Sequence, residues 1–263
     1  MSQRQGQKLV EKYGETTDVS VWKERLKSYA PSTQQYYLYC VHDYLRSKGH
    51  KTEELYKESM KRKAELVEEA KKQQKTPKQE ENWLEWKDIL RVREELGKHL
   101  GNYNKHLRHL ILCLYTMIPP LRLDWAGAEI CASGPVPTEG NIVDIANKVF
   151  LLRNYKTAKR HGALTIPLSD ELMAVIQKSL EMYPRKALLG QREDHNVCMT
   201  QPSLSHTLVR TFRDVSGRSM NLQLLRRSYV SHQMNGQPSL LEQEKQALAL
   251  GHTFAIHQLY RKL

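Results

Sequence analysis

The sequence predicts a mainly α fold with a small β-sheet or hairpin, in which a helical N-terminal domain precedes a larger α+β domain. Apolar residues recur at helical intervals over most of the chain, and two short apolar runs have the length and composition of strands. With 263 residues, 40% of them apolar, the chain is long enough to form one large core or two modest ones. We place a flexible arm at residues 1–18, a helical domain at 19–75, a linker at 76–82 and the second domain at 83–263.

The N-terminal elements follow from the spacing of apolar and aromatic residues. Residues 1–18 are polar and show no periodicity, which predicts a loosely ordered arm. Within residues 19–48 the apolar positions recur at helical intervals on both sides of Pro31, which predicts two short helices. Residues 53–79 form a highly charged helical run with a thin apolar stripe, and Pro77 ends the helix. The tyrosines of the two short helices indicate packing in a small core.

The second domain begins with helices and returns to them after a pair of strands. The apolar run at residues 107–115, followed by Pro119-Pro120, predicts a buried helix that the prolines end. Residues 169–183 predict another helix, because a serine before acidic residues is a capping signal. Further helices are predicted to begin at Gln201 and near Asn221.

Residues 148–155 and 163–168 predict two β-strands, and the basic segment between them predicts a turn closed by a glycine. This hairpin carries Lys156, Lys159 and Arg160 at its tip. Cations on a hairpin tip suit entry into the groove of a nucleic acid. A solvated surface loop is the simpler alternative for this segment taken alone.

The charge of the chain favours a polyanionic partner. The formal net charge is +12 and the pI is about 9.5, with +4 on residues 1–82 and +8 on residues 83–263. Positive charge on both domains suits a clamp around nucleic acid, and a membrane surface is the other polyanion that fits. No apolar run approaches the roughly 18 residues of a transmembrane helix, and no signal-peptide core follows the N-terminus. We therefore expect a soluble, intracellular protein.

The cysteines and histidines do not form a ligand pattern. Cys40, Cys113, Cys131 and Cys198 lie far apart and have no Cys-x-x-Cys spacing, so we expect reduced thiols in a reducing compartment. The eleven histidines are scattered and make no ligand quartet with these cysteines. The sequence therefore predicts no structural metal site.

Residues 221–263 hold the most distinctive group of side chains. They contain Arg226, the run Leu250-Gly251-His252, and Tyr260 close to the end of the chain. These residue types suit attack by a tyrosine hydroxyl on a phosphodiester, because guanidinium and imidazole donors stabilise the extra negative charge of the transition state. Tyr260 is the candidate nucleophile, and Arg226 and His252 are candidate donors to the non-bridging oxygens.

Taken in order, these residues resemble the tyrosine recombinase/integrase family, with its phage-integrase-like catalytic domain. The resemblance is greatest to the divergent members found in eukaryotic mobile elements and large DNA viruses. It covers residues 83–263 with definite motifs and residues 19–75 only by their helical character. The family's first arginine, hairpin lysine, His-x-x-Arg box, Leu-Gly-His run and nucleophile correspond to Arg122, Lys156, Gln223 with Arg226, His252 and Tyr260.

The resemblance implies a chemistry for these residues. Tyr260 would cut and rejoin DNA through a 3′-phosphotyrosyl intermediate, which needs no cofactor, metal or ATP because the bond energy is kept for rejoining. Arg122 and Arg226 would each fork onto phosphate oxygens, with His252 as a further donor. Lys156 would protonate the leaving 5′ oxygen.

The resemblance also implies partners. Residues 19–75 would form a core-binding domain that clamps DNA, and residues 83–263 would form the catalytic domain. The implied partners are double-stranded DNA and further copies of the chain, as a tetramer on DNA, with no membrane. For a virus or mobile element of eukaryotes the compartment would be the host nucleus, and otherwise the cytoplasm or nucleoid. The residues expected to bind DNA are Lys159, Arg160 and Arg227.

Two departures from the family pattern leave alternatives open. Gln223 stands where histidine or lysine is usual, although an amide still donates a hydrogen bond. Three residues follow Tyr260, so the chain either lacks a C-terminal docking helix or is a fragment. A type IB topoisomerase, which uses an equivalent set of residues, and a catalytically inactive DNA-binding relative are the alternative functions.

Overall fold

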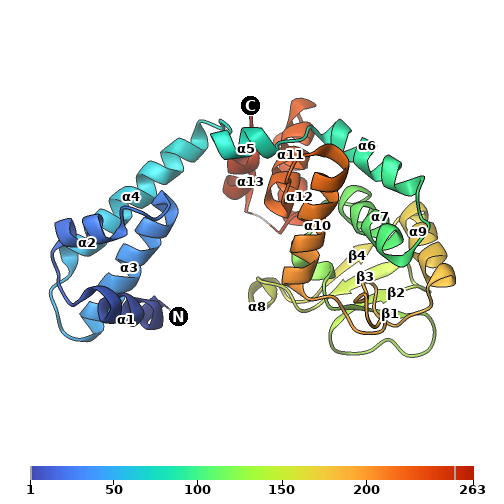
Figure 1. Ribbon diagram of the computed structural model, residues 1–263, viewed down its shortest axis with the longest axis horizontal. Helices are drawn as coiled ribbons and strands as arrows, with labels where there is room; N and C mark the ends of the chain where they lie inside the picture. The colour runs from blue at the N-terminus through green and yellow to red at the C-terminus, as the bar shows by residue number, and fades with distance from the viewer. Residues whose placement is uncertain (1, 252) are drawn as a thin grey trace. The chain divides into compact units, whose positions relative to one another are not determined.

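A computed structural model describes residues 2–251 and 253–263, with the side chains of residues 160 and 161 outside that description. The chain folds into two compact units, an N-terminal unit that ends at Gln74 and a C-terminal unit that spans Lys75–Leu263 (Figure 1). Helices make up most of both units, and a small sheet lies in the C-terminal unit. The predicted fold class, mainly α with a small sheet, is confirmed.

The N-terminal unit contains helices α1 (Ser2–Tyr13), α2 (Val19–Leu26), α3 (Pro31–Ser47) and α4 (Glu53–Lys71). The two short helices predicted on either side of Pro31 are confirmed as α2 and α3. The side chain of Asp18 caps α2 by accepting a hydrogen bond from the Ser20 amide, and Pro31 occupies the first turn of α3. The core of this unit consists of Leu9, Val10, Trp22, Leu26, Leu38, Cys40, Val41, Leu45 and Leu55.

The expectation of a loosely ordered arm at residues 1–18 is wrong for Ser2–Tyr13, which forms α1. This helix packs along α3 and buries Leu9 and Val10. Gly6 permits the close approach, because a Cβ at this position would lie only 2.1 Å from the backbone oxygen of Cys40. Helix α1 therefore owes its order to a partner helix, while its own sequence is mostly polar.

The start of the C-terminal unit, which follows α4, is also helical in part. Helix α4 ends at Lys71, before the predicted end at Pro77. Thr76 and Gln79 form a reciprocal capping box for the short helix α5 (Pro77–Asn82), which occupies the expected linker. The division after Gln74 lies beside the expected domain end at residue 75, and the expected linker at residues 76–82 belongs to the C-terminal unit.

After α5, the C-terminal unit alternates helices with the strands of one sheet. Its elements are α6 (Trp86–Gly97), α7 (Tyr103–Thr116), the 3-10 turn η1 (Leu123–Trp125), β1 (Ala128–Cys131), β2 (Asn141–Asp144), β3 (Val149–Leu152), α8 (Ala158–His161), β4 (Leu164–Pro167), α9 (Asp170–Met182), α10 (Gln201–Ser216), α11 (Leu222–Asn235), α12 (Leu240–Ala249) and α13 (Phe254–Tyr260).

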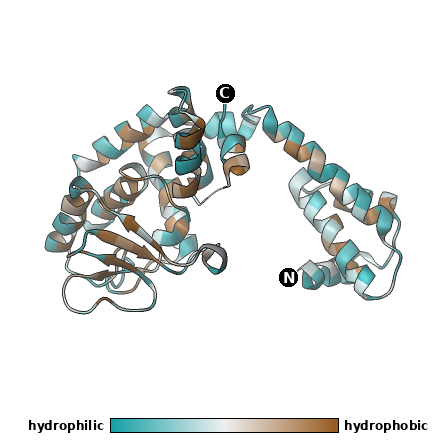
Figure 2. Cartoon of the chain, turned by 180° about the vertical axis from the view of Figure 1, so that it is seen from behind, coloured by the Kyte–Doolittle hydropathy of each residue, from teal (hydrophilic) through white to brown (hydrophobic). Residues whose placement is uncertain are grey.

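The sheet has the order β1-β2-β3-β4, with β1 parallel to β2 and the other neighbours antiparallel. The predicted hairpin is confirmed as β3 and β4, in which Phe150 pairs with Ile166. The segment between these strands contains the helical turn α8 in place of a simple turn. Strands β1 and β2 were not predicted. Figure 2 shows the strands in brown, as apolar segments, and helices that are divided into apolar and polar faces.

Helix α7 runs through the core of the C-terminal unit, as its apolar sequence predicts. Leu110, Ile111 and Leu112 are fully buried, and the helix packs against α6, α9 and α10. After α7 ends at Thr116, the chain passes through the proline pair to η1, where Trp125 stacks on Phe150 of β3 with ring centroids 4.1 Å apart. This stack holds the segment that carries Arg122 beside the sheet.

None of the helices in residues 2–251 and 253–263 has both the length and the apolar content needed to cross a membrane. Cys40, Cys113 and Cys131 are buried free thiols, and Cys198 is a partly buried one.

Candidate active site

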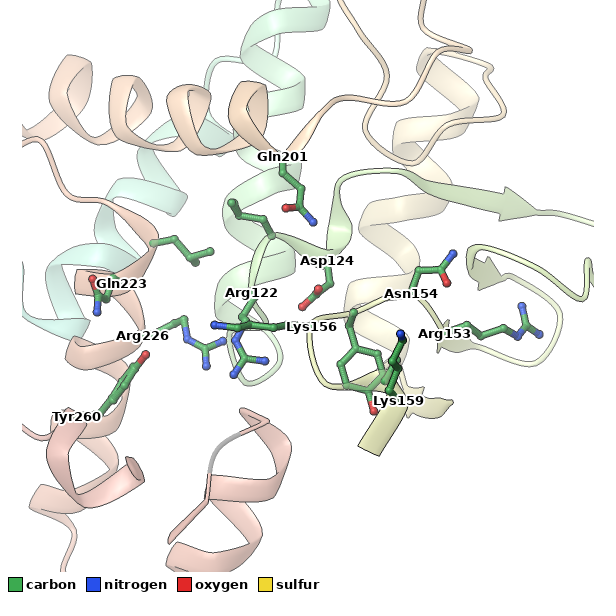
Figure 3. A pocket seen from close by; sticks show the side chains of 14 residues that line it. Arg122, Asp124, Arg153, Asn154, Lys156, Lys159, Gln201, Gln223, Arg226 and Tyr260 are labelled. Atoms are coloured by element: carbon green, nitrogen blue, oxygen red, sulfur yellow. The ribbon is translucent and has the colours of Figure 1, made fainter. Parts of the chain in front are cut away.

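Five of the predicted catalytic residues line one pocket of about 800 Å³ in the C-terminal unit. The pocket lies among the segment before η1, the β3–β4 connection, the first turns of α10 and α11, and the end of α13. Figure 3 shows Tyr260 and Arg226 on one side, Lys159 on the other, and Arg122 and Lys156 between them. Its lining comprises Arg122, Leu123, Asp124, Arg153, Asn154, Tyr155, Lys156, Ala158, Lys159, Gln201, Leu222, Gln223, Arg226 and Tyr260.

Helix α11 presents Arg226 to this pocket from a buried position. The side chain of Asn221 caps the helix by accepting a hydrogen bond from the Leu224 amide, and Arg226 follows in the second turn. Arg226 is 3% exposed; its Nη1 donates to the backbone oxygen of Pro120 and its Nη2 to that of Leu250, both at 2.8 Å. Burial lowers the pKa of Arg226 from its ordinary value, whereas Tyr260 favours the charged form. The two carbonyls fix the plane of the guanidinium.

The segment after the proline pair holds Arg122 at the pocket. The buried hydroxyl of Tyr115 donates to the backbone oxygen of Arg122 at 2.8 Å, which ties this segment to α7. The Arg122 guanidinium donates from Nη2 to the backbone oxygen of Gly251 at 3.0 Å. Arg122 and Arg226 therefore both donate to backbone oxygens of the Leu250-Gly251 pair.

Asp124 lies in the pocket, and it is buried at 6% exposure. Burial raises the pKa of Asp124, and the nearby charges of Arg122 and Arg226 lower it. The carboxyl group thus adds negative charge beside two guanidinium groups that face the same space.

Tyr260 is the last residue of α13, which Thr253 caps by accepting a hydrogen bond from the Ile256 amide. The guanidinium carbons of Arg226 and Arg227 lie 5.9 Å and 5.2 Å from the centre of the Tyr260 ring. The side chain points toward Arg226 in Figure 3. The tyrosine therefore occupies the pocket of its own chain.

The residues after Tyr260 fold back onto the C-terminal unit. The backbone amide of Lys262 donates to Ser231 Oγ of α11 at 2.7 Å. Lys75 Nζ donates to the backbone oxygen of Leu263 at 2.8 Å. These bonds hold the end of α13 against α11, where Arg226 and Arg227 lie.

The β3–β4 connection supplies the lysines of the pocket. Lys156 and Lys159 are exposed and line the pocket on either side of the turn that leads into α8. The hydroxyl of Tyr155 donates to the backbone oxygen of Gly162 at 2.8 Å and closes this connection on itself. Gln223 is also exposed in the pocket, in the first turn of α11 and one turn before Arg226.

The remaining predicted site residues have different outcomes. His252 lies outside the described residues, as does the side chain of Arg160. Arg227, expected to contact DNA, packs its guanidinium over the Tyr260 ring and is half-buried. Burial lowers the pKa of Arg227, and Tyr260 raises it. A contact of Arg227 with DNA stays a prediction.

Several lining residues were missed by sequence reasoning. Asp124 was not among the predicted site residues, and Gln201 was predicted only as the start of a helix. Thr200 caps α10, so that the positive end of this helix, with Gln201, lies at the pocket. The one sequence signal that could have indicated this helix end was the capping residue Thr200. For Asn154 and Arg153, only their closeness to Lys156 pointed to the site.

No protein-family model and no curated protein sequence matches this chain. Its fold is similar to the crystal structure of XerA recombinase, with 10% identity and a TM-score of 0.50 over 100% of this chain and 85% of that one. It is also similar to XerH site-specific recombinase bound to its difH substrate, with 13% identity and a TM-score of 0.54 over 92% of this chain and 65% of that one. At these identities the likeness is one of fold. It confirms the predicted fold class, in which a helical N-terminal domain precedes a larger, mainly α domain with a small sheet.

Proposed function

We propose that this chain is a site-specific DNA recombinase or integrase that cleaves and rejoins DNA through a 3′-phosphotyrosyl intermediate. The observation that carries this proposal is the convergence of Arg122, Lys156, Arg226 and Tyr260, from four separate segments, on one pocket. A tyrosine, two arginines and a lysine can supply a nucleophile, donors to the non-bridging oxygens and a proton for the leaving oxygen of a phosphodiester. The likeness of fold to XerA and XerH recombinases supports the same conclusion.

In the proposed reaction, Tyr260 Oη forms a bond to the scissile phosphorus while the bond from phosphorus to the 5′ oxygen breaks. The phenol proton passes to water, and the Lys156 ammonium donates a proton to the leaving 5′ oxygen. Arg122 and Arg226 stabilise the charge that develops on the non-bridging oxygens. Attack by the freed 5′ hydroxyl on the phosphotyrosine reverses these steps and rejoins the strand.

The fixed arrangement of the arginines favours this role. Arg226 is held by two backbone oxygens and Arg122 by a third, so neither guanidinium has to be ordered when the phosphate binds. The closeness of the Tyr260 ring to Arg226 supports attack within one chain, with nucleophile and arginines from the same protomer.

The proposed partner is double-stranded DNA. The XerH structure contains the difH substrate, and the net charge of +12 on the present chain suits a polyanion. We propose that Lys159 and Arg160 contact DNA from the β3–β4 connection. A tetramer on DNA and a special closeness to members from eukaryotic mobile elements or viruses remain predictions.

The test is trapping of the covalent intermediate. The protein is mixed with nicked suicide substrates that carry candidate element-end sequences, and products are separated on a denaturing gel. We expect a protein–DNA adduct with wild-type protein and none with Tyr260→Phe, which should still bind DNA because only the nucleophilic oxygen is removed.

The matched control is Tyr229→Phe, since Tyr229 packs on Trp86 away from the pocket. This variant should form the adduct at the wild-type level. An adduct that persists in Tyr260→Phe would contradict the assignment of the nucleophile. Relaxation of supercoiled plasmid without any target site would indicate topoisomerase activity in place of recombination, and DNA binding without adduct on any substrate would indicate an inactive relative.

A further inference from the structure

We propose that Asn141 is a positioning residue that fixes Lys156 relative to Arg122, and the proposal rests on the function proposed above. Asn141 is the first residue of β2 and lies outside the pocket lining. It is 6% exposed, although it is a polar residue in a strand of four buried positions. A buried amide needs hydrogen-bond partners, and those of Asn141 belong to two separate segments that line the pocket.

All the hydrogen-bonding capacity of the Asn141 side chain is used. Its Oδ1 accepts from the backbone amides of Arg153 at 3.0 Å and Asn154 at 2.8 Å. Its Nδ2 donates to the backbone oxygens of Asp124 and Asn154, both at 3.1 Å. A carboxamide has two donor hydrogens and two acceptor lone pairs, so the side chain is saturated by these four bonds.

The partners of Asn141 belong to the two segments that carry the charged groups of the site. Asp124 is two residues after Arg122, and Asn154 is two residues before Lys156. One side chain therefore joins the backbone of the arginine segment to the backbone of the lysine segment. The Arg122 segment is held on its other side by Tyr115, so it serves as the fixed point.

Besides Asn141, the lysine segment near Asn154 is held by Arg153 Nη1, which donates to the backbone oxygens of Pro137 at 3.0 Å and Gly140 at 3.4 Å. Neither bond ties the lysine segment to the segment of Arg122. Toward the end of β3, the last residue that pairs with β2 is Leu151, opposite Ile142, and β3 ends at Leu152. Beyond Leu152, the backbone amides of Arg153 and Asn154 donate to Asn141 Oδ1 and have no strand partner. The bond from Tyr155 to Gly162 closes the connection on itself and does not tie it to Arg122.

Loss of the hydrogen bonds of the Asn141 side chain should displace Lys156 more than it displaces the arginines. Lys156 is exposed on a connection between strands, whereas Arg226 is held by two carbonyls. A displacement of about 1 Å at a catalytic group costs on the order of 10²-fold in rate. The cleavage rate should fall because protonation of the leaving 5′ oxygen, the step assigned to Lys156, becomes slower.

The experiment compares two substrates with the full-length chain. One has the natural 5′ bridging oxygen, and the other has a 5′ bridging sulfur, whose thiolate leaves without protonation. Asn141→Asp keeps acceptors for the two amides and removes both donors. We expect Asn141→Asp to cleave the oxygen substrate about 10²-fold more slowly than wild type and to recover most of this loss on the sulfur substrate.

Lys156→Ala is the reference, because it removes the proton donor itself and should show the same selective recovery. The double variant should cleave no more slowly than Lys156→Ala alone, since both changes act on one step. Asn147→Ala is the control. The side-chain amide of Asn147 donates to Asp144 in the turn between β2 and β3, and it makes no bond to the segments of Arg122 and Lys156. It should change neither substrate's rate.

A purely structural role for Asn141 would slow both substrates equally. Equal losses in Asn141→Asp, with selective recovery in Lys156→Ala, would overturn the positioning role and leave the proposed function intact. Absence of selective recovery in Lys156→Ala would show that Lys156 is not the general acid, and it would overturn the positioning role of Asn141 as well. Absence of any adduct in wild type would overturn the proposed function itself. If the aspartate variant does not fold, Asn141→Ser, which retains one donor, gives the same comparison.

Discussion

Arg122 donates a hydrogen bond from Nη2 to the backbone oxygen of Gly251 at 3.0 Å, across 129 residues of sequence. Gly251 has a φ of +64°, and a Cβ at this position would lie 3.3 Å from Arg122 Nη1. Both the backbone conformation and the closeness of the guanidinium therefore favour glycine. With Leu250, whose oxygen accepts from Arg226, this residue pair holds the two arginines of the pocket.

We expect Gly251→Ala to reduce cleavage by roughly tenfold or more, because the new methyl group pushes the Arg122 guanidinium from its place. The rate is measured by single-turnover cleavage of a suicide substrate. Gly217→Ala is a matched control, since Gly217 also has a positive φ, of +73°, but no atom lies within 4 Å of its added Cβ. Both variants should lose about 1 kcal/mol of unfolding free energy from the left-handed backbone. Equal cleavage by the two variants would contradict the contact with Arg122.

We expect Arg226→Lys to lower the cleavage rate by about 10² or more, because an ammonium cannot bond to Pro120, Leu250 and a phosphate in the planar fork of a guanidinium. The free energy of unfolding should also fall, by roughly 1–3 kcal/mol, as a buried carbonyl loses its donor. Single-turnover kinetics and denaturant unfolding measure the two effects.

Arg218→Lys is the control for that change. Arg218 also donates to two backbone oxygens, those of Glu80 and Glu81, but it is exposed and lies outside the pocket. Its replacement should leave cleavage at the wild-type rate. A wild-type rate in Arg226→Lys would show that the forked geometry is not needed.

We expect Gln223→Ala to lose roughly 10² to 10³ in cleavage rate, which is typical for removal of one transition-state donor. Gln223→His should retain cleavage and introduce a pH dependence near neutrality, because histidine titrates there and an amide does not. Rate measurements between pH 5.5 and 8, about the range in which histidine titrates, separate the two variants. An unchanged rate in Gln223→Ala would show that this position, although it lines the pocket, does not take part in the reaction.

We expect His109 to make the C-terminal unit less stable in acid. Burial lowers the pKa of His109 to about 4, with His106 and Arg93 adding to the effect. The unfolded chain has a histidine pKa near 6.5, so it binds more protons than the folded chain between pH 6.5 and 4. The free energy of unfolding must then fall as the pH drops through this window, by about 2 kcal/mol from this group.

His109→Gln should reduce that fall, as measured by thermal or denaturant unfolding at pH 7 and pH 4. The same change at His206, which is exposed on α10, serves as the control and should leave the pH dependence as in wild type. Identical pH profiles for wild type and His109→Gln would contradict the assignment.

The helices could be predicted because their signals are local. Ser169 accepts from the Leu172 amide to cap α9, and Pro31 begins α3, as their sequence positions indicate. Helix α1 and strands β1 and β2 could not be predicted in this way. Order in α1 depends on contact with α3, and β2 buries the polar residues Asn141 and Asp144, whose partners a short window does not contain.

The sequence by itself determined the order of the chemical groups: an arginine after a proline pair, a lysine between two strands, and an arginine and a tyrosine near the end. Tertiary structure alone decided that these groups share one pocket, that Asp124 is buried beside them, and that the oxygens of Leu250 and Gly251 hold both arginines. It also decided that Asn141 joins the segments of Arg122 and Lys156. The reason is physical: hydrogen bonds between distant backbone groups exist only once the whole core has brought them together, so no local pattern of residues encodes them.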